Sequence, residues 1–270
     1  MPELPEVETI RGGIEPFVLN QTICKINIYH KKLRWLIDKD LLRNLLGQKI
    51  SSVQRRGKYL LLVADKDTLI IHLGMSGSLQ IKPYPHLLKK HDHVDIILAN
   101  NKCLCFNDPR RFGALLLAGT PLAYKLLGSL GIEPLTKKFT GQYLYQQAHN
   151  KKIAVKIFIM NNHIVTGIGN IYANEALFLA KIDPRKPANE ISLQKYKLLV
   201  NCIKKILRAA IKNNGTTFRD FVAHDGASGN FKKFLKVYGH NDEPCPICGE
   251  KLQQIRIGQR STIYCPSCQG

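Results

Sequence analysis

The stretch CPICGEKLQQIRIGQRSTIYCPSC, residues 245–268, is the part of the sequence that most strongly determines the fold. It holds two Cys-x-x-Cys pairs separated by 16 residues. Each pair can place two thiolates on one face of a tetrahedral ion, so this spacing is typical of a structural zinc site. Four free or disulfide-bonded cysteines are the alternative. The predicted ligands are Cys245, Cys248, Cys265 and Cys268.

The residues between the two pairs have the pattern of a β-hairpin. Residues 251–257 and 261–264 can pair as strands, and Gly258, Gln259 and Arg260 fall in the turn. A zinc ion held by four cysteines has no open coordination position, so we expect one structural Zn²⁺ and not a catalytic one. Its role would be to position the residues at the hairpin tip, including Arg260.

Upstream of the hairpin, the hydrophobic periodicity changes from strand-like to helical. A helix is expected to open near Pro5, and residues 21–117 contain short apolar runs that predict a β-sandwich or barrel. From about residue 131 to 219 the periodicity is helical, most clearly over 192–212. The sequence therefore predicts an α+β, multidomain protein. Expected strands lie at 22–29, 58–64, 68–73, 93–98 and 114–117.

The composition indicates a polyanionic partner. Lys and Arg number 40 against 20 Asp and Glu, which gives a formal net charge of +20. Residues 1–150 carry 21 basic and 12 acidic side chains and residues 151–270 carry 19 and 8, so both halves are basic. Such an excess repels itself in a compact protein and favours binding to nucleic acid. A basic protein without such a partner is the alternative.

The sequence also bears on location. The start MPELPEVETI is acidic where a signal peptide has basic residues and an apolar run, and no apolar stretch approaches 18 residues. We therefore expect a cytoplasmic protein that does not enter a membrane.

One glycine-containing motif precedes a predicted helix. In VTGIGNIYANEAL, residues 165–177, the glycines form a turn, Asn170 is a candidate N-cap, and the helix is expected from Ile171. The motif is not a dinucleotide fingerprint, because Tyr172 occupies a position that requires Gly or Ala. Exposed N–H groups at such a helix start can bind phosphate, although many helices begin this way and bind nothing.

Three loops of the β lobe carry residues suited to contacts with a nucleic acid. HLGMSG, residues 72–77, presents Met75 between glycines, for which a buried core methionine is the alternative. NDPRRFG, residues 107–113, places two arginines and Phe112 on a tight turn, as a base-stack wedge beside phosphate ligands would require. His91 and His93 lack further metal ligands nearby, so a phosphate or hydrogen-bonding role is expected for His91.

These motifs together resemble those of the formamidopyrimidine-DNA glycosylase family. The resemblance covers nearly the whole chain and rests on PELPEVET, QRRGKYL, HLGMSGSL, KHDHVD, NDPRRFG, VTGIGNIYANEALF and the zinc finger. Composition and spacing alone indicate only a basic, zinc-stabilised protein that binds nucleic acid. The chemistry that follows is what the resemblance implies.

The resemblance implies three domains and a repair function. They are an N-terminal β-sandwich lobe with an N-terminal helix (1–131), a helix–two-turn–helix lobe (132–235) with a lesion-capping loop at about 216–233, and a zinc finger (236–270). The family removes 8-oxoguanine and formamidopyrimidines from damaged double-stranded DNA in base-excision repair, and then nicks the backbone by β,δ-elimination. A monomer in the bacterial cytosol or nucleoid is expected.

The implied catalytic residues are Pro2, Glu3, Lys58 and Arg260. After removal of Met1, Pro2 has a secondary amine whose ordinary pKa is near 8, roughly two units below that of lysine. The positive end of the following helix favours the neutral, nucleophilic form further. Attack on the sugar would displace the base and leave an iminium ion that promotes elimination of phosphate. Glu3 resembles the proton donor, Lys58 the donor for the first elimination, and Arg260 that for the second.

The resemblance also implies a DNA-binding set. Met75, Arg110 and Phe112 correspond to the residues that fill the space left by a flipped nucleotide. The expected contacts to the DNA backbone are His91, Arg110, Lys151, Asn170 and Arg260.

Two other functions remain open from the sequence. An endonuclease VIII-like enzyme would have the same lobes and proline but would prefer oxidised pyrimidines. The start Leu4-Pro5-Glu6, Met75 with Arg110 and Phe112, and the glycine-rich loop favour the purine enzyme. A non-catalytic zinc-containing DNA-binding protein is the alternative of another class.

Overall fold

The computed structural model describes residues 2–216 and 229–270 and divides into two compact units. The N-terminal unit comprises residues up to Gly128 together with 213–230, and the helical unit comprises Ser129–Lys212 and Phe231–Gly270. Most of the loop expected at 216–233 lies outside the described residues. The three-domain division stays a prediction, and each unit is taken by itself below.

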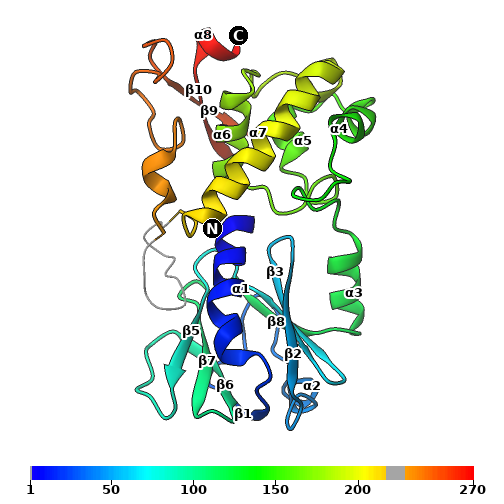
Figure 1. Cartoon of the computed structure of the whole chain (residues 1–270), viewed down its shortest axis with the longest axis vertical. Coiled ribbons are helices and arrows are strands. Elements are labelled where there is room, and N and C mark those ends of the chain that lie inside the picture. Colours follow the sequence, from blue (N-terminus) through cyan, green and yellow to red (C-terminus); the bar gives the residue numbers. More distant parts are fainter. Residues whose placement is uncertain (1, 217–228) are drawn as a thin grey trace. The chain divides into compact units, whose positions relative to one another are not determined.

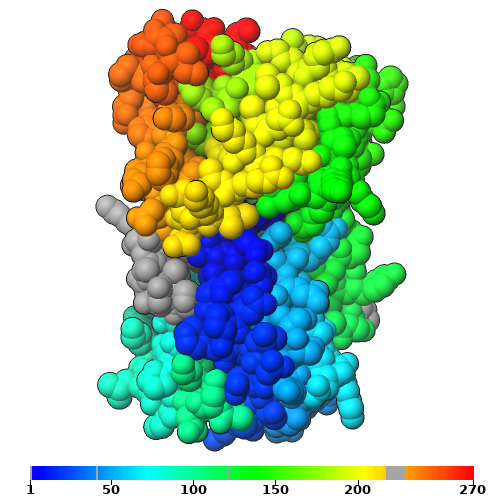
Figure 2. Space-filling model, viewed as in Figure 1, coloured from blue at the N-terminus to red at the C-terminus, as the bar shows by residue number. Residues whose placement is uncertain are grey.

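The N-terminal unit begins with helix α1, Leu4–Val18 (Figure 1). A proline in the first turn and an acidic residue beside it favour the helix start. Leu4, Val7, Ile10 and Ile14 recur every three or four residues, and all are fully buried. The opposite side of α1 reaches the surface of the unit, beside the first strands of one sheet (Figure 2). The helix is therefore part of the core and not an appendage.

Two four-stranded antiparallel sheets make up the rest of this unit (Figure 1). One has the order β1-β6-β7-β5 and the other the order β2-β3-β4-β8. Short helices α2, Lys39–Arg43, and α3, Pro121–Gly128, accompany them. The strands are β1 Ile23–Ile28, β2 Ile50–Arg56, β3 Tyr59–Ala64, β4 Thr68–His72, β5 Ser78–Pro83, β6 Asp92–Leu98, β7 Lys102–Asn107 and β8 Ala114–Leu117.

The predicted β-sandwich with an N-terminal helix is confirmed. Apolar side chains from both sheets and from α1 form one continuous core. The five strands expected from the sequence are present, and β2, β5 and β7 are additional. These three have mixed polar and apolar sequences, so their periodicity does not identify them as strands.

The helical unit is built around α7, Leu193–Lys212, against which α4 and α6 pack. The helix predicted over 192–212 is present, and its buried residues, among them Leu199, Ile203 and Leu207, lie on one side. Leu198, also expected on that side, is 43% exposed. The remaining helices are α4 Gly141–Ala148, α5 Val155–Ile159, α6 Asn170–Leu179, η1 Ala188–Glu190 and η2 Phe231–Phe234.

The C-terminal module belongs to the same unit by packing. Strands β9, Gln253–Ile257, and β10, Arg260–Tyr264, form a hairpin that is followed by the short helix α8, Pro266–Gln269. The hairpin packs against α6, and a small apolar cluster joins Phe178 of that helix to Leu252 and Ile263. Within the described part of the chain, no helix is both long and apolar enough to cross a membrane.

Candidate functional site

Pro2 and Glu3 lie at the start of α1, and both are buried. Glu3 is the N-cap residue, and its backbone N–H donates to Oε2 of Glu6 over 2.9 Å. The Glu3 carboxylate accepts from the backbone of Glu6 in return, which completes a capping box. This arrangement fixes the backbone immediately after Pro2. It also places the proline at the positive end of the helix dipole, which disfavours a cationic amine there.

Glu6 has a second role that the sequence alone does not reveal. Its other carboxylate oxygen, Oε1, accepts from the backbone N–H of Thr216 over 2.8 Å and from the Thr216 hydroxyl over 3.0 Å. Both residues are buried. The N-terminal segment is therefore tied to the residues where the expected capping loop begins. The partners are separated by 210 positions, so no local pattern could indicate this contact.

Lys58 lies in the turn between β2 and β3, and it is buried, with 9% of its surface exposed. Arg55 in β2 pairs with Glu8 of α1 over 2.8 Å, and Arg11 donates to the carbonyl of Val53. These contacts show that β2 runs antiparallel to α1. The turn that carries Lys58 thus points toward the helix end that carries Pro2 and Glu3.

Burial and then the charges of Lys58 and Arg34 lower the pKa of His72 to about 4. This histidine is consequently neutral at physiological pH, and its Nδ1 accepts from the backbone N–H of Gly74 over 3.1 Å. Because this imidazole is neutral, Lys58 carries its positive charge without electrostatic repulsion from His72.

The two wedge loops are joined by Asp108, which is fully buried. Its carboxylate accepts from the Ser76 hydroxyl over 2.7 Å and from the backbone N–H of Gly113 over 2.8 Å. Gly74 approaches the Phe112 backbone so closely that a Cβ would collide with it. Loops 73–77 and 108–113 therefore form one rigid pair. The sequence indicated the arginines of this motif but not the aspartate that holds them.

The side chains expected to meet DNA project from these loops. Arg110 is exposed, its guanidinium lies 5.1 Å from the ring centroid of Phe112, and that ring is 46% exposed. Met75 is half-buried, so it is not the core methionine of the alternative interpretation. His91 is partly exposed, and its carbonyl accepts from the backbone N–H of Asp108 over 3.0 Å. The structure thus brings these four residues onto connected loops of one unit.

The four C-terminal cysteines form a zinc centre. Their sulfur atoms all lie within 4.8 Å of one another, with Cys248 and Cys265 separated by 3.5 Å. The backbone N–H of Cys268 donates to the sulfur of Cys265, as is usual where thiolates bind a metal. A backbone N–H from Glu250 lowers the pKa of Cys248 to about 7, whereas burial raises that of Cys265 and the hydrogen bond with Cys248 raises that of Cys268. Four thiolates this close together repel one another, so a bound cation is needed to hold them. The arrangement fits one structural Zn²⁺.

The hairpin turn differs slightly from the prediction. Arg260 is paired with Ile257 as the first residue of β10, and the turn consists of Gly258 and Gln259 alone. Both have positive φ values, 53° and 63°, as a two-residue hairpin turn requires. A Cβ on Gly258 would collide with the side chain of Ile157. Arg260 is exposed at the tip, next to this close contact.

Two buried or partly buried polar side chains hold the strand that begins with Arg260. Lys156 is fully buried, and its ammonium donates to the carbonyl of Ser261 over 2.9 Å and to the hydroxyl of Thr262 over 2.7 Å. Asn170 donates to the same Ser261 carbonyl over 3.0 Å. The predicted residues Asn170 and Arg260 are thereby brought together in one unit. A lysine with this burial is not recognisable from the sequence.

The role predicted for Asn170 as N-cap is wrong. Helix α6 starts at Asn170 itself, and its N-cap is Gly169. The side chain of Asn170 faces the hairpin because Ser261 supplies an acceptor for its amide N–H. Its Oδ1 atom is buried and accepts no hydrogen bond from the described residues.

Two further side chains of α6 anchor the C-terminal module. Glu175 is fully buried and accepts three backbone N–H groups, those of residues 236, 237 and 238, over 2.8 to 2.9 Å. Asn174 accepts from the backbone N–H of Ile263 over 2.9 Å. Lys151, the remaining predicted DNA contact of this unit, is exposed just after α4.

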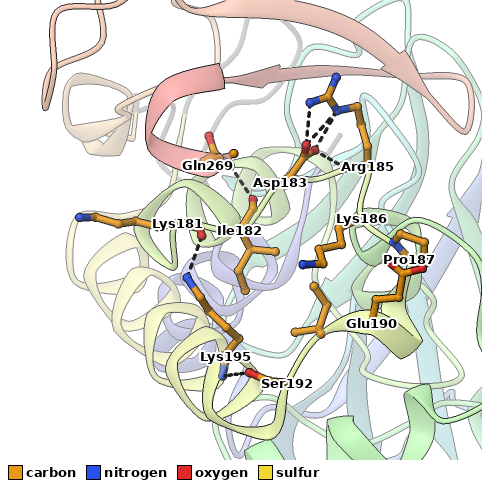
Figure 3. Close-up of a pocket in the computed structure, with 12 residues that line it drawn as sticks. Lys181, Ile182, Asp183, Arg185, Lys186, Pro187, Glu190, Ser192, Lys195 and Gln269 are labelled. Atoms are coloured by element: carbon orange, nitrogen blue, oxygen red, sulfur yellow. Dashed lines mark hydrogen bonds and ion pairs between the residues drawn. The ribbon is translucent and has the colours of Figure 1, made fainter.

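A pocket of about 570 Å³ in the helical unit contains none of the predicted site residues (Figure 3). It lies between the end of α6, the start of α7 and the last residues of the chain. Asp183 is paired with Arg185 over 2.6 Å, and Lys195 donates to the carbonyl of Lys181 over 3.0 Å. Its charged side chains are thus partly engaged with one another.

A β-sandwich, a helical unit and a four-cysteine hairpin, all rich in basic residues, define a zinc-containing protein that binds nucleic acid. The comparisons with known proteins identify the family. The profile of the formamidopyrimidine-DNA glycosylase N-terminal domain matches residues 1–115, that of the family's H2TH domain matches 130–222, and that of the zinc finger found in FPG and IleRS matches 242–270.

Relatives and solved structures agree over the whole length. The formamidopyrimidine-DNA glycosylase of Pseudomonas aeruginosa (strain LESB58) is 52% identical over 269 residues, and that of Nitrosococcus oceani is 50% identical over 270, each with 100% of both chains covered. Three structures of Lactococcus lactis Fpg, bound to DNA containing an abasic site, an N7-benzyl-Fapy-dG or an oxidised pyrimidine, have TM-scores of 0.90, 0.91 and 0.90. All three are 34% identical and cover 99% of both chains. The chain belongs to the formamidopyrimidine-DNA glycosylase family.

Proposed function

We propose that this protein is a base-excision repair glycosylase and lyase that removes oxidised purines from damaged duplex DNA and then nicks the backbone. The observation that carries the proposal is the position of Pro2, buried directly before a capped helix start, in a chain of this family. The solved relatives bound to abasic-site and Fapy-dG DNA support a substrate of this kind.

Pro2 is the nucleophile of the proposed reaction. Once Met1 is removed, the lone pair of its secondary amine forms a bond to C1′ of the damaged nucleotide, and the base leaves with the electrons of the bond that breaks. Glu3, held beside Pro2 by the capping box, is the proton donor in this step. The proline nitrogen then releases its proton, and the C1′–O4′ bond breaks as the ring oxygen O4′ takes up a proton. The product is an iminium ion at C1′, which carries its positive charge without protonation.

The lyase steps follow from that cation. An iminium at C1′ withdraws electrons and acidifies C2′, so loss of a C2′ proton expels the phosphate on the 3′ side. A second elimination expels the phosphate on the 5′ side. We assign Lys58, at the helix end that carries Pro2, to the first elimination and Arg260, at the hairpin tip, to the second.

Both units contribute to DNA binding. Met75, Arg110 and Phe112 fill the space left by the flipped nucleotide, since they project from the rigid loop pair held by Asp108. The backbone contacts are His91 and Arg110 from the N-terminal unit and Lys151, Asn170 and Arg260 from the helical unit. Phosphate contacts of this kind position a protein on DNA without reading its sequence.

The remaining proposals concern organisation and location. We assign the division 1–131, 132–235 and 236–270 to the domains, and the segment of about 216–233 to a loop that caps the lesion. Glu6 would couple this loop to the catalytic segment through Thr216. The protein acts as a monomer in the cytosol, where its partner DNA lies.

A lesion comparison tests the substrate class. Single-turnover base release is measured on matched duplexes that carry one 8-oxoguanine, one thymine glycol or undamaged guanine. We expect release of 8-oxoguanine to be faster than that of thymine glycol by more than about tenfold, which corresponds to about 1.4 kcal/mol in activation free energy. Faster release of thymine glycol would identify the endonuclease VIII-like enzyme instead.

Binding measurements alone cannot make this distinction, because one Lactococcus lactis structure holds an oxidised pyrimidine. Release must therefore be measured. Glu3→Gln serves as the chemical control, since it should bind the 8-oxoguanine duplex but release little base. Tight binding without release by the wild-type protein, after removal of Met1, would indicate a non-catalytic DNA-binding protein.

A further inference from the structure

A second group of metal-binding side chains lies in the N-terminal unit, away from the residues assigned above. His86, Asp95 and Cys105 offer an imidazole nitrogen, a carboxylate oxygen and a sulfur, and these three atoms lie within 4.8 Å of one another. Asp95 on β6 and Cys105 on β7 are direct neighbours in the sheet, so they share one of its faces. The three side chains are buried, with exposures of 8% for His86, 1% for Asp95 and 0% for Cys105.

The hydrogen bonds of His86 leave its Nε2 atom facing a carboxylate. Nδ1 lies 3.1 Å from the backbone carbonyl of Leu87, which can only accept, so Nδ1 must carry a proton. Nε2 lies 2.8 Å from Oδ2 of Asp95. With Nδ1 as the donor to this carbonyl, the Nε2 lone pair of a neutral ring points at the carboxylate. At 2.8 Å only a proton fits between the two atoms, so a metal ion would bind them after they move apart and would replace that proton.

A metal-binding histidine has this arrangement. Such histidines donate the N–H of their other nitrogen to a backbone carbonyl or a carboxylate, which fixes the tautomer and orients the ring. The contact from Nδ1 of His86 to the Leu87 carbonyl supplies this hydrogen bond.

Asp95 has an oxygen available for a further ligand. Its Oδ2 accepts from the hydroxyl of Tyr29 over 3.0 Å, and Tyr29 in turn accepts from the amide of Asn27. Its Oδ1 is buried and has no hydrogen-bond partner among the described residues. A buried carboxylate oxygen without a donor is costly, and a bound cation would remove that cost.

Cys105 has a positively charged neighbour. The ammonium of Lys82 lies 3.2 Å from its sulfur and pairs at the same time with Asp92 over 2.8 Å. Burial and the carboxylates of Asp95 and Asp92 raise the pKa of the Cys105 thiol, so a metal ion bound here would have to displace the thiol proton.

We propose that His86, Asp95 and Cys105 bind a second Zn²⁺ ion, distinct from the ion of the zinc finger. Nitrogen, oxygen and sulfur donors suit this borderline ion, whereas Ca²⁺ and Mg²⁺ need several oxygen ligands. Ligand atoms around tetrahedral zinc are roughly 3.4 to 3.6 Å apart given the usual bond lengths. Small side-chain rotations from the present separations reach that geometry.

The ion would cross-link the segment that covers this face of the sheet. Residues 84–91, which include His86, cover the strands to which Asp95 and Cys105 belong. This segment ends at His91, a proposed DNA contact. In its middle, Leu87 is 93% and Leu88 is 53% exposed. These residues are followed by Lys89 and Lys90. The rate at which trypsin cleaves after these lysines therefore measures how firmly the segment is fixed to the sheet.

Metal counting tests the proposal on the full chain with the finger loaded. The protein is dialysed to one zinc per chain, titrated with Zn²⁺ against a chromophoric chelator, and the bound ions are counted. We expect a second ion in the wild type and in the control Cys24→Ser, whose exposed cysteine lies on β1 of the same sheet. His86→Gln and Cys105→Ser should lose this ion, with affinity weakened by roughly 100-fold or more, and keep the finger ion as an internal standard of folding.

Proteolysis gives a measurement that needs no variant. Trypsin cleavage after Lys89 and Lys90 should slow severalfold when the wild type takes up its second zinc, and cleavage at other sites should not change. One zinc per chain in the wild type at saturation would overturn the proposal. A second ion that remains in both His86→Gln and Cys105→Ser would also overturn it. Neither result depends on glycosylase activity.

Discussion

The N-terminal unit and the zinc hairpin hold their functional residues by different means. Pro2 and Glu3 directly precede a helix whose apolar side enters a core of 25 buried side chains among the described residues. In the part of the chain that the structure describes, the apolar cluster beneath the hairpin has six, and two of these are the zinc ligands Cys245 and Cys265. Arg260 is therefore positioned by a metal ion and by buried polar groups, not by an extensive core.

The difference shows where single changes should have large effects. In a large core, many side chains contribute to the free energy of folding, so the loss of one contact removes only a small part of it. In the C-terminal module, which has a small apolar cluster, each directed contact to zinc, Lys156 or Glu175 is a larger part of the total. The predictions below test this contrast, starting with the largest effect.

Removal of one zinc ligand should disorder the hairpin and leave the sandwich intact. We expect Cys268→Ala to lose the ion of the finger, and DNA affinity to fall. Because zinc contributes about 10 kcal/mol or more in such modules, amide exchange over 253–264 should accelerate more than about 100-fold. Exchange in β6 and β7 should not change. Cys202→Ala, in α7 of the same unit, is the control, and retention of the finger ion by Cys268→Ala would contradict the four-cysteine site.

Loss of the Glu175 carboxylate should weaken the anchor of the C-terminal module. Glu175→Gln places an amide N–H against one of three backbone N–H donors, so a buried donor loses its acceptor. We expect the free energy of unfolding to fall by about 2 to 4 kcal/mol, measured by urea denaturation and circular dichroism. Glu190→Gln, at an exposed position in the same unit, should change it by less than about 0.5 kcal/mol. Equal effects of the two substitutions would refute the anchor.

A buried carboxylate in the sandwich should have a smaller, pH-dependent effect. Burial alone would raise the pKa of Asp92, but hydrogen bonds from Lys82, Lys89 and Asn107 outweigh it and lower the pKa from 3.8 to about 2. At pH 7 this difference corresponds to about 2 kcal/mol of stability, which Asp92→Asn should remove.

The sign of this pH dependence follows from the lowered pKa. Stabilisation by Asp92 is fully present above the ordinary pKa of 3.8 and is lost as the pH falls through about 2. The difference in unfolding free energy between the wild type and Asp92→Asn should therefore shrink between pH 4 and pH 2. Asp40→Asn, at an exposed ion pair, should show almost no difference at any pH. A difference for Asp92→Asn that stays constant down to pH 2 would exclude this explanation.

Local patterns predicted much of the fold correctly. The long amphipathic helix α7, the five predicted strands and the two Cys-x-x-Cys pairs are each defined by residues close in sequence. Strand β7, with the sequence KCLCFN, could not be predicted this way. It is a strand because it lies between β6 and β5, which pair with it on both sides.

The supporting residues of the candidate site were missed for a related reason. The sequence around Lys156 suggests an ordinary surface lysine. The carbonyl and hydroxyl that accept its hydrogen bonds belong to residues 105 and 106 positions later, so no local pattern indicates them. Glu6 reads as a first-turn acid of a helix, whereas its second partner is Thr216. Motifs thus identified the residues proposed to meet DNA, and only the tertiary structure identified those that hold them. Asn170 was interpreted as a cap because its hairpin partner is 91 residues away.

Covalent trapping tests the central claim, that Pro2 is the nucleophile, most directly. Protein freed of Met1 is incubated with abasic-site duplex and borohydride, and the adduct is digested and mapped by mass spectrometry. We predict one sugar adduct per chain on the peptide that begins with Pro2, and no adduct with protein that retains Met1, since the proline nitrogen is then an amide. An adduct on a lysine, or undiminished trapping with Met1 present, would contradict the account.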